Sequence, residues 1–246
     1  MFEDYVPKKK IGVLSPLAAV ESGPYEFYQI APKGVILVTI PVGLREFSKE
    51  DVERVFASLD QNLDYLMGRS IDIIIQSGVP LPLLVGPEYL DRLLAHIRER
   101  TKLPTTSQVL CVVEAVKHMG IKKIVAANKW NEGMNENLGR FFAQGGISLL
   151  GTHSRSMLPS EFVKMSGLDG INLAYDLGRG AFQNFPETDA VYIGGSAWLT
   201  LPVIERLEEE FGKPVFTNHS ATVWDLLHKL DFWTPIRGYG KLLNSD

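Results

Sequence analysis

Glycines and hydroxyls, rather than obvious nucleophiles, stand where this sequence could bind a ligand. In DAVYIGGSAWLTLPVIERLEEE, residues 189–210, an apolar strand pattern runs into Gly194-Gly195-Ser196 and an amphipathic helical pattern follows. Ser77 and Gly78 follow an earlier apolar run in the same way. Glycine lets a ligand approach the backbone closely, and free N–H groups at a helix start attract anions. A small carboxylate is therefore the predicted ligand, although a tight turn alone would explain either glycine.

The other candidate residues share one position, the C-terminal end of a predicted strand. Open α/β sheets bind ligands in the crevice beyond these ends. Helix starts in this crevice also offer Thr and Ser hydroxyls, at residues 105–107 and at Ser220. The predicted binding residues from this position are Ser15, Pro16, Ser77, Gly78, Val79, Asn128, Trp130, Gly194, Gly195, Thr217 and Asn218.

Three side chains in the predicted crevice could carry charge or transfer protons. His219 would act there as a general base or a carboxylate-binding cation, or would simply be an exposed residue at a helix start. Lys129 stands at a strand end beside Trp130. It is either solvated, as most lysines are, or a cation or desolvated base for the substrate. Ser196 lacks an adjacent base, and no GxSxG motif supports a serine hydrolase.

Other kinds of site are argued against by the sequence. Cys111 is the single cysteine, which excludes an intrachain disulfide, and its apolar neighbours predict a buried packing residue. The five histidines lack HxH or HExxH spacing, so no metal site is predicted. Neither a GxxxxGK[ST] loop nor a strand-linked GxGxxG is present, and no cofactor is predicted.

The composition is that of an ordinary globular protein. Of 246 residues, 45% are hydrophobic and 22% are charged, and the net charge is −4. A mild acidic excess without a long basic run argues against nucleic acid as a partner. No apolar run reaches membrane-spanning length, and the N-terminal segment MFEDYVPKKK lacks the apolar core of a signal peptide. A cytoplasmic location is therefore expected.

Short apolar runs alternate with helical patterns along the chain. Strands are predicted at residues 11–14, 35–40, 71–75, 124–127, 147–150, 191–193 and 215–216. Helical stripes are predicted over 52–66 after a Ser48 cap, 90–97 after Pro87, 109–116 before Gly120, 204–211 after Pro202 and 223–227 after a Ser220 cap. The segment 178–180, Gly-Arg-Gly, is expected to form a turn. This alternation predicts mainly parallel sheets with helices on both faces.

The order of these elements repeats once. Lys-Lys-Ile opens a strand at Lys9 and again at Lys122. A strand ends in glycine at Gly78 and again at Gly195, and a proline precedes a hydroxyl-rich helix start at 104 and 214. The spacing between the members of each pair is nearly constant. Two copies of one α/β unit are favoured, although all strand–helix units share such punctuation.

Longer stretches resemble the Asp/Glu racemase superfamily, and within it arylmalonate decarboxylase and maleate cis-trans isomerase. The similarity runs nearly end to end, through IGVLSPLAA, LPTTSQVLCVVEAVKHMGIKKIVAAN, WNEGMNENLGRFFAQGGISLLG, GGSAWLTLPVIERLEEEFGKPVFTNHSATVWDLL and RGYGKLL. The resemblance implies two pseudo-symmetric α/β halves with the active site between them. It also implies a small carboxylic acid as substrate, no cofactor, and a monomer or small homo-oligomer.

The sequence departs from that family at the site. The resemblance implies a catalytic thiol on each half in racemases and isomerases, and only the second thiol, with glycine at the first position, in arylmalonate decarboxylase. Here the first position falls on Gly78, as in the decarboxylase, but the second falls on Gly195, and Cys111 matches neither. Val79 and Pro80 stand where the family has carboxylate-binding hydroxyls, and Trp130 where it has a tyrosine. These three residues, Pro80 included, are therefore also predicted to bind the substrate, as an apolar pocket that desolvates the leaving carboxylate. A racemase or isomerase that needs both thiols is therefore argued against. Decarboxylation is more tolerant, because hydrogen-bond donors stabilise the enediolate and another acid can supply the proton.

The sequence thus predicts an α/β fold of two doubly wound halves, each with a mainly parallel four-stranded sheet. The halves are expected at 1–119 and 120–225, with a tail at 226–246 and part of the C-terminal segment packing on the first half. The expected activity is that of a decarboxylase or other lyase acting at the carbon alpha to a carboxylate. Lys129, His219 or Ser196 would transfer the proton, and N–H groups of the Gly78 and Gly195 loops would hold oxygens. The alternatives are a catalytically silent carboxylate-binding protein and an isomerase or hydrolase with a relocated nucleophile.

Overall fold

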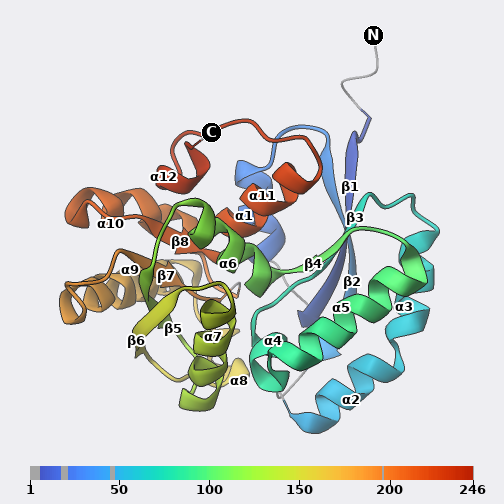
Figure 1. The fold of residues 1–246 in the computed structure, drawn as a ribbon, viewed down its shortest axis with the longest axis horizontal. Coiled ribbons are helices and arrows are strands. Elements are labelled where there is room, and N and C mark those ends of the chain that lie inside the picture. The colour runs from blue at the N-terminus through green and yellow to red at the C-terminus, as the bar shows by residue number, and fades with distance from the viewer. Residues whose placement is uncertain (1–5, 18–21, 45–47, 196, 246) are drawn as a thin grey trace.

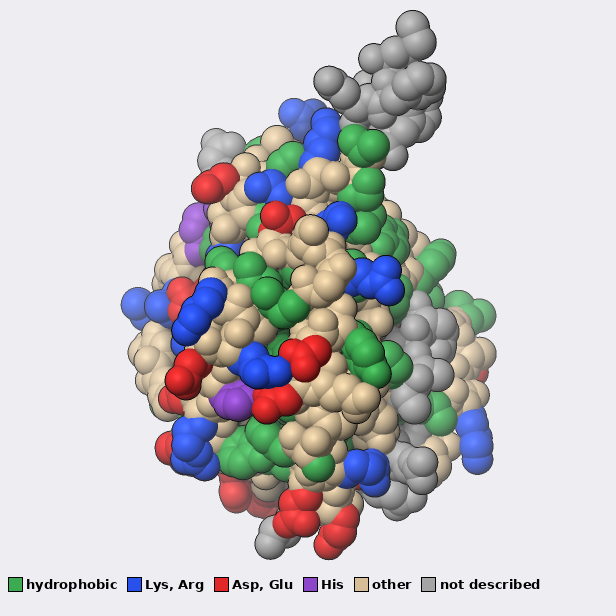
Figure 2. All heavy atoms as spheres, turned by 90° about the vertical axis from the view of Figure 1, so that its right-hand side faces the viewer, with side chains coloured by type: hydrophobic (Ala, Val, Ile, Leu, Met, Phe, Trp, Pro, Cys, Tyr) green, Lys and Arg blue, Asp and Glu red, His purple; other side chains and the backbone are tan. Residues whose placement is uncertain are grey.

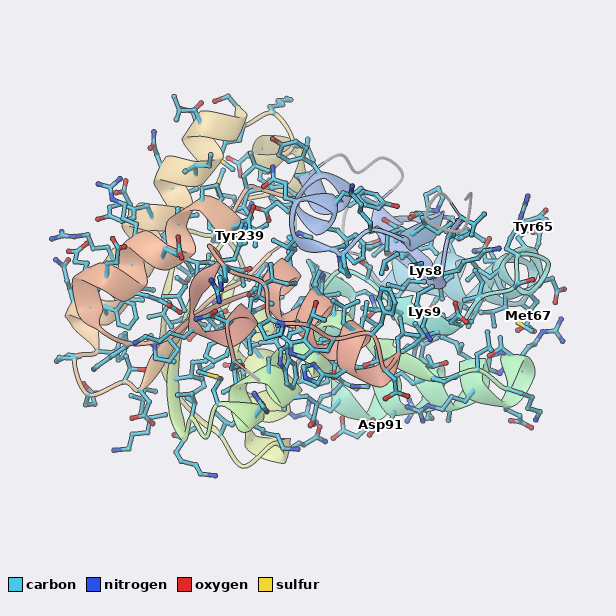
Figure 3. The ribbon with its side chains drawn as sticks, turned by 90° about the horizontal axis from the view of Figure 1, so that it is seen from above. Lys8, Lys9, Tyr65, Met67, Asp91 and Tyr239 are labelled. Atoms are coloured by element: carbon cyan, nitrogen blue, oxygen red, sulfur yellow. The ribbon has the colours of Figure 1, made fainter. Side chains whose placement is uncertain are left out.

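The computed structural model describes residues 6–17, 22–44, 48–195 and 197–245. Two four-stranded parallel sheets form the centre of the molecule, and helices cover them (Figure 1). The strand orders are β2-β1-β3-β4 and β6-β5-β7-β8. The predicted fold class is confirmed. Seen from above, the two halves lie side by side, and Tyr65 and Met67 project from the far end of the first (Figure 3).

The first half contains β1 (Lys9–Leu17), α1 (Ser22–Ile30), β2 (Val35–Leu44), α2 (Lys49–Ala57), α3 (Leu59–Met67), β3 (Ile73–Gln76), α4 (Pro80–Val85), α5 (Pro87–Thr101), β4 (Thr105–Ser107) and α6 (Gln108–His118). The second contains β5 (Lys123–Asn128), α7 (Glu132–Gln144), β6 (Ser148–Ser154), α8 (Pro159–Phe162), α9 (Gly167–Asn184), β7 (Ala190–Ile193), the 3₁₀-helix η2 (Leu201–Val203), α10 (Ile204–Phe211), β8 (Val215–Thr217), α11 (Asn218–Lys229) and α12 (Gly240–Leu243). All residues of β3 and β7 are buried, as expected for parallel strands covered on both faces.

The repeated sequence landmarks correspond to repeated structure. The Asp72 carboxylate accepts the N–H of Lys10, and the Asp189 carboxylate accepts the N–H of Lys123. Strand register repeats as well, since β1 pairs with β3 as β5 pairs with β7. Each half also ends in a strand followed by a helix whose preceding hydroxyl residue caps it, Ser107 before α6 and Thr217 before α11. The two halves are therefore copies of one unit.

The helices α6 and α11 join the halves. They pack against each other, and α11 also contacts α1 of the first half (Figure 1). The division at residues 119 and 225 stays a prediction. The face of the first half shown in Figure 2 carries interspersed acidic and basic side chains.

Three local expectations were wrong. The apolar stripe over residues 52–66 belongs to two helices, because α2 ends and α3 begins at Ser58. Ser48 caps α2, as predicted. Ser220 does not begin α11; Thr217 caps it, and Ser220 returns a hydrogen bond in a capping box. The 178–180 segment lies inside α9, because its glycines let Leu207 and His153 pack against the helix backbone.

Candidate active site

A small cavity of about 180 Å³ lies on one face of the first sheet, beneath α1 and α11. Alternate residues of the paired strands β1 and β3 face it, and Ser15 and Ser77 lie at their C-terminal ends. Side chains of the second half complete the wall. The lining residues are Val13, Ser15, Pro16, Leu17, Gly23, Pro24, Phe27, Leu37, Thr39, Pro41, Ile75, Ser77, Gln108, Ala197, His219, Thr222 and Leu226. Of the predicted site residues, the cavity therefore brings together Ser15, Pro16, Ser77 and His219.

His219, on the first turn of α11, meets a buried carboxyl group at this cavity. Its Nε2 atom lies 3.7 Å from Oε2 of Glu26, which comes from α1 in the other half. Both side chains are buried. An imidazole and a buried carboxyl group thus face each other beside the cavity, an arrangement typical of proton transfer.

Glu26 also fixes the segment that follows the Gly194-Gly195 junction. Its Oε1 atom accepts the N–H of Leu201 at 2.7 Å, and its Oε2 atom accepts the hydroxyl of Thr200 at 3.1 Å. Burial raises the pKa of Glu26 to about 7, and these hydrogen bonds oppose the rise only partly. At neutral pH this carboxyl group is therefore poised between its acid and its carboxylate.

The Gly78 loop is closed by its own neighbours. Gly78 has φ +83°, and its N–H donates to Oε1 of Gln108 at 3.0 Å. Its carbonyl accepts from Nε2 of Gln76. A Cβ atom at position 78 would lie 2.2 Å from Cγ of Pro16. The ring of Pro16 therefore occupies the space that a side chain at position 78 would need.

The Gly195 loop is closed in the equivalent way. Its φ is +117°, and its N–H donates to Oδ1 of Asn218 at 3.0 Å. A Cβ atom there would lie 3.0 Å from Nε1 of Trp198, whose indole N–H donates to the Gly195 carbonyl. The N–H groups predicted to hold substrate oxygens at both glycines are thus already paired inside the protein.

A chain of buried amides joins these two loops. Asn218 donates from Nδ2 to Oε1 of Gln108 at 3.2 Å, so the two side chains that hold Gly78 and Gly195 also bind each other. Gln108 is the first residue of α6, and Asn218 is the first residue of α11. The pseudo-symmetry therefore places one amide from each half at the centre of the molecule.

The remaining predicted residues have internal partners or are buried. Asn128 donates to Asn135 and accepts the N–H of Trp130. The indole of Trp130 packs against Gly194, where a Cβ atom would lie 2.5 Å from the ring. Val79 is fully buried, Pro80 begins α4, and Thr217 caps α11. Ser196 lies outside the described residues.

Lys129 is buried beside a second, larger cavity. Its Nζ atom lies 4.1 Å from the ring centroid of Trp198 and 4.7 Å from that of Phe162. Both rings line a cavity of about 660 Å³, which shares Leu17 and Ala197 with the first. Burial lowers the pKa of Lys129 to about 7. The ammonium form predicted to bind a carboxylate is therefore only partly populated at neutral pH.

Sequence reasoning missed Glu26, Gln108 and Thr222. Glu26 lies in the helical stretch SGPYEFYQI, where a charged residue normally faces solvent, so no local signal marks it. Gln108 directly follows the hydroxyl residues 105–107, which were predicted to face the crevice. It occupies the position in the first half that Asn218 occupies in the second, so the internal repeat could have identified the pair. Recognising either residue requires contacts between segments far apart in the sequence.

The charged groups at the site are few among the described residues. No described lysine or arginine lines the first cavity, so an anion there would depend on hydroxyls and His219. In the part of the chain that the structure describes, no three His, Cys, Asp or Glu side chains cluster as metal ligands would. The described helices include none with the length and apolar content needed to cross a membrane.

Two half-domains, with a cavity lined by residues of both, define a protein of the Asp/Glu racemase-like class, as the sequence resemblance implied. A model of the arylmalonate decarboxylase family matches residues 11–243, and the chain belongs to that family. Arylmalonate decarboxylase of Bordetella bronchiseptica is 26% identical over 238 residues, 96% of each chain. Maleate isomerase of Geobacillus stearothermophilus is 20% identical over 204 residues, 80% of this chain and 79% of the relative.

Solved structures share the fold. A crystal structure of arylmalonate decarboxylase superposes with a TM-score of 0.81 at 22% identity, covering 96% of this chain and 100% of the other. The maleate isomerase from Pseudomonas putida S16 gives a TM-score of 0.82 at 18% identity, covering 96% and 98%. The relatives are a decarboxylase and isomerases, so enzymatic activity in this chain is supported.

Proposed function

We propose that this protein is a cofactor-independent enzyme that decarboxylates a small carboxylic acid at the carbon alpha to a carboxylate. The observation that carries the proposal is the His219–Glu26 pair beside the hydroxyl-lined cavity. Membership of the arylmalonate decarboxylase family supports this class of reaction. Lyase chemistry is favoured over thiol-dependent isomerisation because glycines stand at 78 and 195 and the single cysteine, Cys111, is buried in the core.

The proposed reaction uses groups of both halves. The hydroxyls of Ser15 and Ser77 would bind the carboxylate that is retained, and the apolar wall would desolvate the one that leaves. The bond between the alpha carbon and the leaving carboxylate breaks, CO₂ departs, and the electron pair remains as an enediolate. The imidazolium of His219 would then transfer its proton to the alpha carbon, and solvent would return the proton.

The test is turnover of a panel of malonates carrying aryl or alkyl arms, followed by NMR in D₂O. Decarboxylation should place one solvent deuteron at the alpha carbon. The variant His219→Asn, which keeps a polar side chain, should lose roughly 10²–10⁴-fold in kcat, the usual contribution of a general acid. Unchanged turnover in that variant would remove His219 from the mechanism.

A catalytically silent carboxylate-binding protein is the second candidate. The observation that favours it is that the N–H groups of Gly78 and Gly195 are already bound to Gln108 and Asn218. The same panel, extended to maleate, hydantoins and amino acids, separates the two functions. Thermal stabilisation by a ligand without chemical change in any of them would favour the silent protein.

A further inference from the structure

Lys129 holds an amine that the described protein does not satisfy. The residue is 4% exposed, and among the described residues its Nζ atom has no hydrogen-bond partner. Only aromatic faces adjoin it in the contacts that the structure gives, those of Trp198 and Phe162. Burying an amine without a hydrogen bond is costly, so such a group is retained where it has a use.

The two rings that contact this amine also line the second cavity. Phe162 and Trp198 line that cavity together with Met165 and Leu199, so its wall beside Lys129 is apolar. Leu17 and Ala197 line both cavities, so the two cavities lie next to each other. A molecule with its carboxylate in the first cavity and an apolar arm in the second would pass close to these rings.

We propose that Lys129 is a covalent attachment site that condenses with the carbonyl group of a 3-oxo acid whose apolar arm lies in the second cavity. A neutral amine in an apolar environment is the form of lysine that attacks carbonyl carbons. A 3-oxo acid is the matching class, because its ketone carbon is bonded directly to the alpha carbon, which is the carbon that loses CO₂. An imine there can accept the electron pair that the departing carboxylate leaves behind.

The chemistry balances without a further reactant. The neutral Lys129 nitrogen bonds to the carbonyl carbon, the carbonyl oxygen leaves as water, and one proton taken up from solvent gives an iminium. The bond to the carboxylate then breaks, CO₂ leaves, and the electron pair moves to the iminium nitrogen as an enamine forms. A second solvent proton is added to the alpha carbon, and water hydrolyses the iminium to release a ketone, the free amine and one proton. Imine formation stands on its own, whereas the decarboxylation step rests on the proposed function.

Selective trapping tests the attachment. The protein is incubated at pH 7 with acetoacetate or 3-oxohexanoate and cyanoborohydride, and the labelled peptide is identified by mass spectrometry. With a pKa of about 7, Lys129 is half neutral at that pH. A solvated lysine with a pKa near 10.4 has a neutral fraction about a thousandfold smaller. Label should therefore concentrate on Lys129, and its rate should fall roughly tenfold per pH unit well below pH 7.

Three variants control the experiment. Lys129→Met and Lys129→Arg should both lose the label, and the arginine variant keeps a cation between the rings while lacking a nucleophile. Lys164→Met removes an exposed lysine near Phe162 and should keep the label. Phe162→Ala should speed trapping, because it removes one of the rings that cover the amine. Each variant is checked for a cooperative unfolding transition.

The outcomes separate the two proposals. Label spread evenly over exposed lysines, or unchanged in Lys129→Met, would overturn the attachment site. Decarboxylation of 3-oxo acids at an unchanged rate in Lys129→Arg would also overturn its role as the attachment site, whereas malonate turnover by the wild type would still support the proposed function. A trapped adduct without CO₂ release from any acid tested would support the attachment site while contradicting the proposed decarboxylation.

Discussion

Glu26 both accepts hydrogen bonds from the segment before α10 and lies beside His219 at the cavity. It accepts hydrogen bonds from Thr200 and Leu201, which fixes the start of η2, and it stands 3.7 Å from His219 at the cavity. The hydrogen bonds favour the carboxylate, whereas burial favours the neutral acid, and burial is the larger effect. The protonation of this group therefore couples the stability of one half to the chemistry proposed at the interface.

Replacing Glu26 with Gln should change how stability depends on pH. The folded pKa of about 7 lies above the unfolded value of about 4.5, so the folded protein binds more protons between them. The stability that Glu26 contributes is present below pH 4.5 and is lost as pH rises through 7, by roughly 3 kcal/mol at most. Urea unfolding at a series of pH values should show that loss in the wild type and not in Glu26→Gln. Parallel pH profiles for the two proteins would contradict the burial argument.

Lys129 should make the free energy of unfolding rise with pH, opposite to the effect of Glu26, and in a higher pH range. Its folded pKa of about 7 lies below the unfolded 10.5, so the unfolded chain binds more protons between these values and stability rises with pH there. Lys129→Met should abolish that rise and be more stable than the wild type at pH 7 by roughly 2–5 kcal/mol. Lys164→Met is the matched control, since its side chain is exposed, and should leave the slope unchanged. A Met variant less stable than the wild type would show that the aromatic contacts outweigh the desolvation.

At the scale of elements, the loop after β3 shows why a side chain at position 78 would be costly. Gly78→Ala adds a Cβ atom both at positive φ and against the ring of Pro16, so it should destabilise the protein by roughly 2–5 kcal/mol. Gly120→Ala is the matched control, with φ +68° and nothing within 4 Å of the added atom, and should show the backbone strain alone. Denaturant midpoints provide the measurement.

The contact with Pro16 is separable from the strain. Pro16→Ala combined with Gly78→Ala should recover the part of the loss that exceeds the Gly120→Ala value, because the ring atoms at 2.2 and 2.9 Å are removed. If the double variant loses as much free energy of unfolding as Pro16→Ala and Gly78→Ala lose together, the Pro16 ring does not determine the cost of a side chain at position 78.

The same scale shows which elements could be predicted. The strands with apolar runs and the helices opened by Ser48 and Pro87 are where the pattern places them. The strand β4 was not predicted, because Thr105–Ser107 is three hydroxyl residues long and is defined by its pairing with β3. Glycines inside α9 indicate close packing rather than a turn, and packing partners are invisible in a local window.

At the scale of the molecule, the sequence located one side of the site better than the other. The strand-end rule placed Ser15, Ser77 and His219 together, and all three line the first cavity, because the ends of parallel strands converge at one edge of a sheet. The rule could not show that amides from α6 and α11 already hold the glycine N–H groups, nor that α1 supplies a carboxyl group. Such partners are set by how the two copies dock, which the internal repeat alone does not specify.

The two halves are joined by the pair Gln108 and Asn218, which bind each other. Gln108 also binds the Gly78 loop, and Asn218 binds the Gly195 loop. Gln108→Leu leaves buried polar atoms on both sides unpaired and should cost roughly 1–3 kcal/mol. Because Asn218 loses a partner as well, amide hydrogen exchange should quicken at Gly78 and also at Gly195 in the other half.

Asn135→Leu is the matched control, since it breaks a buried amide pair with Asn128 that lies within the second half. It should cost a similar amount while leaving exchange at Gly78 unchanged. Faster exchange at Gly78 alone in the Gln108 variant would show that the amide chain does not carry the coupling, and that the glycine loops are held by their own halves.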